Sequence, residues 1–456
     1  MQDLIDTVQR NCDIADARHG ADYGMCTYLL KMRELYRWEH RLPLGAPLGK
    51  EDVGEWLTAR EAHLEGLEQA DFHPLPLNGC AIDPFDAEAI NAALNAQGLV
   101  YSAGLVQGAR AHFFLAELED ERSADNGFRL RVSGRELARC LNAPPAMTRG
   151  STIFLRRESL RRYLWEKYES WLWNRPQNAM ARALAFYPFD TAIDDALDAM
   201  TTVEMATVEA HERGEYQAGR ELGDAWEAML YDLKLTPAEL MARAVRDHLA
   251  DCTHTLPLLL KAGRESSLHF YIANLGAMRK QLFPSLEVAY RAWIASGDPS
   301  VFGDAIAQGA DHWLDLARRL LALHARHADE MHQHDADAED RTRREDGPPR
   351  ARAEMQHQER EPREQDRDQD PVLLPVLGRS PVLFLHAPDP PPIVDHVSSW
   401  SRYRPPRRGQ GARQTPRRSL VPEQRCSRAR WLSSMLRWGL FEERIFTLAN
   451  GATCDG

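Results

Sequence analysis

Long apolar stretches and clustered cysteines are what this sequence of 456 residues lacks. No apolar run approaches the roughly 20 residues that a membrane-spanning helix needs, so we expect no membrane span. The opening, MQDLIDTVQR, lacks the basic and then apolar pattern of an export signal. The 7 cysteines are scattered without a CxxC pair, which favours reduced thiols over a disulfide framework or a zinc ribbon. These absences together predict a cytoplasmic protein.

Motifs that bind phosphate or build a hydrolase are also missing. The sequence has no G-x-G-x-x-G after a strand, no G-x-x-x-x-G-K-[ST] and no G-x-S-x-G. Its 56 Lys+Arg and 68 Asp+Glu give a net charge of −12, which argues against nucleic acid as a partner of the whole chain. A homo-oligomer stays open, and no reaction follows from composition.

The first of three parts, residues 1–175, predicts a small mixed α+β domain. Apolar spacing indicates a helix over 26–38 and strands at 98–105 and 112–118. The second strand leads through a polar, glycine-containing segment to 128–132, which is typical of a hairpin. Further along, Ser133 is a candidate cap for a short helix ending at Cys140, residues 152–155 predict a strand, and 159–173 predict a basic, aromatic helix.

Residues 190–330 predict a helical bundle. Four long patterns of helical period stand out, at about 202–233, 237–260, 266–283 and 303–327. Thr236 before Pro237 is a typical N-cap followed by proline in the first turn. Short connections between the four patterns suggest antiparallel packing. The fold class is therefore mainly α, with a small α+β domain ahead of the bundle.

Residues 341–456 have a different composition. They hold 14 of the 27 prolines and 21 arginines but no lysine, and they show no sustained hydrophobic period. Such a segment cannot bury enough apolar surface to fold, so we expect a disordered Arg/Pro-rich tail. Three interpretations stay open: an out-of-frame translation of a GC-rich strand, a disordered linker, or a basic arm that binds nucleic acid.

The helix expected at 202–233 carries the most informative residues. At about 100° per residue, its apolar side chains form one stripe, with charged residues opposite. Glu204, His211 and Glu215 nevertheless lie within that apolar stripe. Because an unpaired buried charge costs several kcal/mol, these groups must be paired, hydrogen-bonded, protonated or bound to a metal.

The next helix repeats this pattern more weakly. His248 falls on its apolar stripe and Asp251 lies about 60° away, at the edge. If the two stripes pack together, His211 and Glu215 face His248, with Asp251 within reach. Carboxylates and imidazoles that project inward from facing helices are how di-iron and di-manganese sites are built.

The sequence thus predicts a divalent metal site (zinc, iron or manganese) with five candidate ligands. These are Glu204, His211, Glu215, His248 and Asp251. The segment 211–215 also resembles the His-Glu-x-x-His helix of zinc peptidases, although Glu215 replaces the second histidine. That analogy implies Glu212 as a general base. The alternative is a non-catalytic interaction or scaffold protein in which the same residues form a structural polar network, so whether the protein is an enzyme stays open.

Several segments carry a family resemblance. They are NCDIADARHGADYGMCTYLLKMRELYRWE, VGEWLTAREA, NAPPAM, HERGEYQAG, RAVRDHLADC and HFYIANLGAMRKQLFP. The chain resembles, over about residues 1–325, an uncharacterised bacterial family catalogued under an Sfum locus tag, whose regions are domains of unknown function. The resemblance implies a bacterial cytosolic protein and supplies no activity, ligand or catalytic residue.

Overall fold

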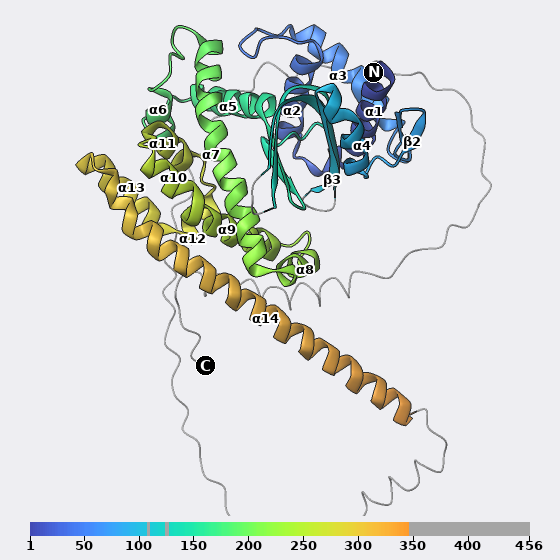
Figure 1. The fold of residues 1–456 in the computed structure, drawn as a ribbon, viewed down its shortest axis with the longest axis vertical. Helices are drawn as coiled ribbons and strands as arrows, with labels where there is room; N and C mark the ends of the chain where they lie inside the picture. Colours follow the sequence, from blue (N-terminus) through green and yellow to red (C-terminus); the bar gives the residue numbers. More distant parts are fainter. Residues whose placement is uncertain (107–109, 124–126, 346–456) are drawn as a thin grey trace, which may run out of the picture. The chain divides into compact units, whose positions relative to one another are not determined.

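The computed structural model describes residues 1–106, 110–123 and 127–345, and the side chains as far as residue 328. The tail predicted at 341–456 begins as helix, because residues 341–345 continue the last helix of the fold. The rest of that prediction lies outside the described residues. The predicted fold class is confirmed: the chain is mainly helical, with a sheet in its amino-terminal part (Figure 1).

The amino-terminal part contains five helices and seven strands in the described residues. The helices are α1 (Gln2–His19), α2 (Met25–Glu39), α3 (Lys50–Glu65), α4 (Ala87–Leu94) and α5 (Arg157–Leu172). The strands are β1 (Leu75–Leu77), β2 (Cys80–Ile82), β3 (Leu99–Val106), β4 (Arg110–Ser123), β5 (Arg129–Arg139), β6 (Ala146–Arg149) and β7 (Thr152–Arg156). The expected strands and the helices α2 and α5 are therefore present, whereas α1 was not predicted.

Strands β3 to β7 form one sheet with the order β3-β4-β5-β7-β6. The β4–β5 hairpin is antiparallel, as expected, while β5 and β7 run parallel. The short helix predicted from Ser133 to Cys140 is wrong. That segment continues strand β5, because Ala138 and Arg139 pair with Leu115 and Phe114 of β4. Sheet pairing has overridden a local capping signal.

Two groups of helices pack on the sheet. Helix α1 buries Leu4, Val8 and Cys12 in a core shared with α4, β3 and β4. Helix α7 (Ile193–Leu222) instead packs Met205 and Val208 against the apolar residues of β5 and β7. Helix α7 therefore shares a core with the sheet, beside which it runs (Figure 1).

The helices after α7 are more numerous than expected, and all but the last, which is longer than the predicted 303–327, are shorter than the predicted ones. They are α8 (Asp224–Asp232), α9 (Pro237–Ala250), a π-helix (Asp251–Thr255), α10 (Leu256–Lys261), α11 (Glu265–Asn274), α12 (Ala277–Leu282), α13 (Pro284–Ser296) and α14 (Phe302–Glu345). The single helix predicted at 202–233 is wrong in one respect: it ends at Gly223, whose φ of 73° only glycine adopts easily. Residues of α8, such as Trp226, therefore join the core of the later helices.

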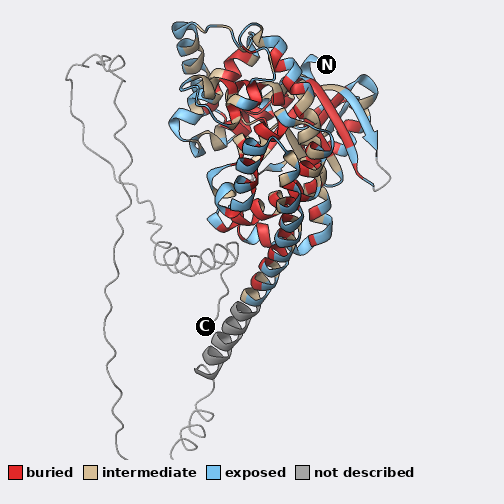
Figure 2. Ribbon diagram, turned by 90° about the vertical axis from the view of Figure 1, so that its left-hand side faces the viewer, coloured by how far each residue is buried: buried red, intermediate tan, exposed pale blue. Residues whose placement is uncertain are grey.

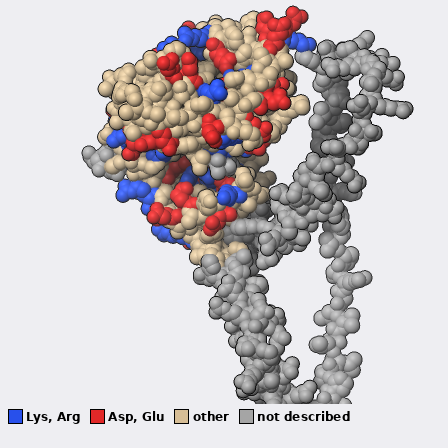
Figure 3. All heavy atoms as spheres, turned by 90° about the vertical axis from the view of Figure 1, so that its right-hand side faces the viewer, with Lys and Arg blue, Asp and Glu red and all other residues tan. Residues whose placement is uncertain are grey.

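The cap predicted for α9 is confirmed. The Thr236 side chain accepts a hydrogen bond from the backbone N–H of Glu239, and Pro237 occupies the first turn. Buried and exposed residues alternate along the helices as amphipathic packing requires (Figure 2). In the part of the chain that the structure describes, no helix is long and apolar enough to cross a bilayer. Figure 3 shows acidic and basic side chains interspersed over one face of the molecule.

Candidate metal centre

The candidate site lies where α7 crosses the end of α9. Gly214 makes this crossing close: a Cβ added there would lie 2.7 Å from the carbonyl oxygen of Ala250. The absence of a side chain at Gly214 therefore lets the α7 backbone meet α9. As a consequence, His211 and Glu215, one turn apart on α7, come directly against the side chains that end α9.

A π-helix forms the other wall of the site. It begins at Asp251, immediately after α9, and Pro257 follows shortly after it. In an α-helix the ring of this proline would clash with the carbonyl four residues earlier, to which it also has no N–H to donate. The wider π turn relieves that clash. Single π turns of this kind occur often at functional sites. Here the turn starts on the residue that holds His211.

Asp251 fixes the His211 ring. Its Oδ1 accepts a hydrogen bond of 2.7 Å from Nδ1 of His211, and its Oδ2 accepts one of 2.8 Å from the Tyr271 hydroxyl. Arg279 also pairs with Oδ2 of Asp251. Because a carboxylate only accepts, Nδ1 must carry the hydrogen, which leaves Nε2 as the ring atom that faces the rest of the site. Asp251 is buried, whereas the His211 side chain is 27% exposed.

On the other side of the ring, Nε2 of His211 lies 3.4 Å from Oε1 of Glu215. The second oxygen of Glu215 accepts a hydrogen bond of 3.0 Å from Arg246. Asp247 lies in the last turn of α9, four residues before Asp251, and completes the group of possible metal ligands. The ligand atoms of His211, Glu215 and Asp247 all lie within 4.8 Å of one another, the one such group found among the described residues.

The electrostatics of the site follow from crowded carboxylates in a partly buried place. Burial opposes the charge on His211, but Asp251 and then Glu215 outweigh it and raise the pKa of His211. Burial likewise opposes ionisation of Asp251 and Glu215, yet their cationic neighbours hold both pKa values below the usual range. Asp247 has the opposite behaviour, since burial and the adjacent Glu215 raise its pKa to about 7. A proton on Asp247 thus offsets the excess of carboxylate.

Two of the predicted ligands lie elsewhere. His248 donates from Nε2 to the carbonyl of Arg279 at 3.1 Å and stacks on Trp313, with 4.6 Å between ring centroids. Glu204 accepts a hydrogen bond of 2.7 Å from Ser267. Both residues are buried, as the apolar stripes predicted, but the structure does not bring either of them to the cluster that contains His211.

Glu212, the candidate base, faces the sheet. Its Oε2 accepts a hydrogen bond of 2.7 Å from the hydroxyl of Thr148 on β6. Burial and then the charge of Glu215 raise the pKa of Glu212. The residue therefore links α7 to the amino-terminal part of the chain at the edge of the site.

Asp247 is the site residue that sequence reasoning missed. It lies off the apolar stripe of its helix, so a search for polar residues within the stripe passes over it. The signal that could have found it is its spacing: residues 247 and 251 are four apart and share one helix face.

The fold and the site define a mainly helical protein with an α+β amino-terminal part and a cluster of nitrogen and oxygen ligands. Comparison with protein families gives the assignment. Residues 3–156 match the amino-terminal domain, and residues 161–344 the carboxy-terminal domain, of a family of unknown function (DUF6866). The chain belongs to this family, which confirms the predicted membership of a family without known function. No curated protein and no solved structure matches the chain.

Proposed function

We propose that the protein binds one divalent transition metal through Nε2 of His211 and carboxylate oxygens of Glu215 and Asp247. The observation that carries the proposal is the convergence of these three ligand atoms within 4.8 Å of one another. Asp251 takes the role of orienting His211 through Nδ1, rather than that of a direct ligand. Metal-binding histidines almost always donate their second ring N–H to such a partner.

The chemistry of the donors favours zinc, iron(II) or manganese(II). One imidazole and two carboxylates suit these ions better than copper(I), which prefers sulfur. Three protein ligands leave coordination positions for water or substrate, as in catalytic zinc sites. The partial exposure of His211 and Glu215, 27% and 19%, gives such a ligand access. A hydrolytic or redox reaction at the metal is compatible with this arrangement, and the proposal assigns neither.

A structural polar network is the second candidate. It is favoured by the cations already present, because Arg246 pairs with Glu215 and Arg279 pairs with Asp251. In that account the cluster joins α7 to α9 and binds nothing, and the protein acts as an interaction or scaffold protein. The two accounts differ in whether metal accompanies the purified protein.

Metal content of the full chain, purified without a histidine tag, tests the proposal. We expect close to one equivalent of zinc, iron or manganese by mass spectrometry, and its loss in His211→Ala. His254→Ala is the matched control, since His254 lies on the adjacent π-helix and bonds only to Thr253 among the contacts described. Metal that persists in His211→Ala would refute the site. A metal-free wild type whose His211→Ala variant is merely less stable would support the structural network.

We also propose that the protein works in the bacterial cytoplasm. The support is chemical: the five cysteines among the described residues, Cys12, Cys26, Cys80, Cys140 and Cys252, are free thiols. Free thiols persist in a reducing compartment. Fractionation of bacterial cells that carry the gene, with detection by an antibody to the protein, tests this location. We expect the protein in the cytoplasmic fraction.

A further inference from the structure

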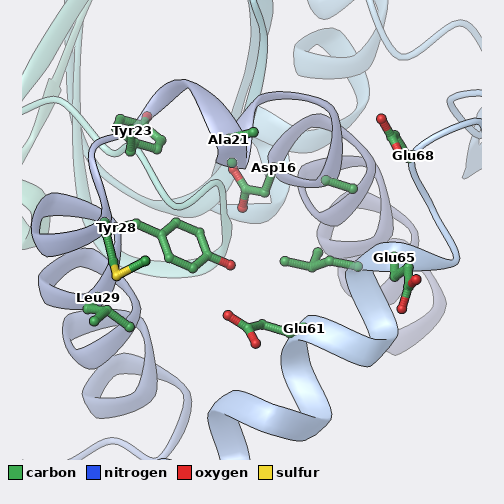
Figure 4. Close-up of a pocket in the computed structure, with 12 residues that line it drawn as sticks. Asp16, Ala21, Tyr23, Tyr28, Leu29, Glu61, Glu65 and Glu68 are labelled. Atoms are coloured by element: carbon green, nitrogen blue, oxygen red, sulfur yellow. The ribbon is translucent and has the colours of Figure 1, made fainter.

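An open cavity lies in the amino-terminal part, bordered by α1, α2, α3 and the segment between α1 and α2. Its volume is about 680 Å³, which is within the usual range for a small-molecule site. Twelve residues line it, and those that matter here are Asp16, Tyr28, Leu29, Leu64 and the glutamates that α3 and the residues after it supply. Figure 4 shows how the labelled side chains surround this space.

The charge of the lining is one-sided. Four of the twelve lining residues are carboxylates, and none is lysine, arginine or histidine. Glu61 and Glu65 come from α3, and Glu68 follows that helix. The cavity therefore offers a negative environment to whatever enters it.

Asp16 lies at the base of the cavity and is only 9% exposed. Its Oδ2 accepts a hydrogen bond of 2.7 Å from the backbone N–H of Leu141, and its carboxylate points into the space beside Tyr28 (Figure 4). The nearby guanidinium of Arg60 is already paired with Asp13 and Glu39. Burial raises the pKa of Asp16 to about 7, and the charge of Asp13 adds to this effect. Among the described residues no cation forms an ion pair with Asp16, although the charges of Arg60 and Arg139 act on its carboxylate from a greater distance.

The remaining walls are apolar and aromatic. Tyr28, Leu29 and Met25 extend from α2, and Leu64 closes the opposite side from α3. Burial and the carboxylates of Glu61 and Asp16 raise the pKa of Tyr28, which keeps its hydroxyl in the neutral form. A ligand that fits must therefore combine a positive charge with an apolar body.

We propose that this cavity binds a small organic amine. The ammonium group would lie between Asp16 and the Tyr28 hydroxyl, and the hydrocarbon part would lie against Leu29, Leu64 and the Tyr28 ring. A bare metal ion fits less well, because the carboxylates of this cavity do not form a cluster with converging ligand atoms among the described residues. The site is separate from the His211 cluster and does not depend on the function proposed for it.

Binding of n-hexylamine to the full chain, measured by calorimetry at pH 8, tests the proposal. We expect saturable binding, with 1-hexanol and hexanoate at least ~10-fold weaker, because a lost ion pair of about 1.4 kcal/mol corresponds to tenfold in affinity. Asp16→Asn keeps an oxygen for the Leu141 N–H and should weaken hexylamine by a similar factor. Asp3→Asn, which removes the same charge from the start of α1, should leave the affinity unchanged.

Two further variants keep the proposal open to refutation if Asp16→Asn folds poorly. Tyr28→Ala should weaken the binding of hexylamine because it removes the aromatic wall, and Tyr231→Ala, which removes an exposed tyrosine of α8, should have no effect. The absence of saturable binding at millimolar hexylamine would overturn the proposal. Equal affinity for 1-hexanol, or an unchanged affinity in both Asp16→Asn and Tyr28→Ala, would overturn it as well.

Discussion

Two networks of charged side chains in this molecule differ in how far solvent reaches them: one is closed to solvent and the other is open to it. In the first, Glu136 of β5 accepts hydrogen bonds from Arg156 of β7 and Ser159 of α5, and both ionic side chains are fully buried. In the second, around His211, the imidazole and Glu215 are partly exposed and Asp247 adds a further carboxylate. The comparison suggests that the closed network holds the fold together, whereas the open one has ligand atoms to offer.

The same contrast is seen in the histidines. His112, next to Arg156 in the closed network, is buried, and burial and then Arg156 lower its pKa to about 3. His211 has a raised pKa because two carboxylates surround it. Arginines around a histidine repel an incoming cation, whereas carboxylates attract one, and the bound metal then displaces the proton from the imidazole.

The largest effect is expected in the closed network. Arg156→Met should lower the free energy of unfolding by about 3–5 kcal/mol, because it leaves Glu136 buried without its partner. Urea denaturation measures this change. The double variant that adds Glu136→Gln should recover part of the loss. An Arg156→Met variant as stable as the wild type would show that the closed network does not stabilise the fold.

The helix crossing at the open site gives the next largest effect. Gly214→Ala should cost about 2 kcal/mol, because the new Cβ meets the backbone of Ala250. The control is Gly219→Ala on the same helix, where nothing lies within 4 Å of the added Cβ. That substitution should stabilise the protein by about 0.5–1 kcal/mol through helix propensity. An equal change in the free energy of unfolding for the two glycine variants, measured by urea denaturation, would show that α7 and α9 are not in close contact at Gly214.

A smaller effect concerns pH. Since the pKa of Asp247 is about 7 in the folded protein against an ordinary value of 3.8, the folded state retains, between these pH values, a proton that the unfolded state releases. Stability of the metal-free protein should therefore fall as pH rises from about 4 to 7. Asp247→Asn should reduce this fall by about 1 kcal/mol. The pKa of His211 is also raised, but from an ordinary value of 6.5, so the stability that its charge contributes is lost only above about pH 6.5 and does not produce the fall between about pH 4 and 6.

The pH experiment has a matched control. Asp311→Asn replaces an exposed aspartate on α14 and should leave the slope of stability against pH as it is in the wild type. Thermal unfolding of the three proteins at several pH values, with a chelator present, is the measurement. A slope that Asp247→Asn does not change would mean that Asp247 is not crowded by Glu215.

The smallest effect is expected for an exposed ion pair. The distance from Nη2 of Arg318 to Oε1 of Glu221 is 3.0 Å, and the two side chains are 63% and 40% exposed. Arg318→Ala should change the free energy of unfolding by no more than about 0.5 kcal/mol, because solvent screens such a pair. A loss of unfolding free energy as large as that of Arg156→Met would show that burial does not decide how much an ion pair stabilises this protein.

Sequence patterns predicted the elements whose stability is local or follows from simple alternation. Strands β3 and β7 and the cap at Thr236 are examples. The pattern failed where distant pairing decides the structure. Ser133 has the chemistry of a helix cap, but its segment pairs with β4 and β7 and becomes strand.

The candidate site was predictable only in part. Helical spacing indicated that His211 and Glu215 share the inner face of α7 and that Asp251 lies within reach, and these contacts are present. Spacing could not tell which side of α9 meets α7. His248 therefore faces Trp313 instead, and Asp247, off the apolar stripe, takes its place in the cluster. The close approach of Gly214 to Ala250, which sets this geometry, depends on tertiary packing.

A zinc titration of the metal-free full chain, followed by calorimetry, is the most direct test of the central claim. Asp247→Asn should be titrated beside the wild type, since it removes one ligand charge with almost no change in shape. We expect one site in the wild type that is lost in the variant, together with proton release, because bound metal displaces protons from its ligands. Zinc binding of equal affinity and stoichiometry in the two proteins, or none in either, would contradict it.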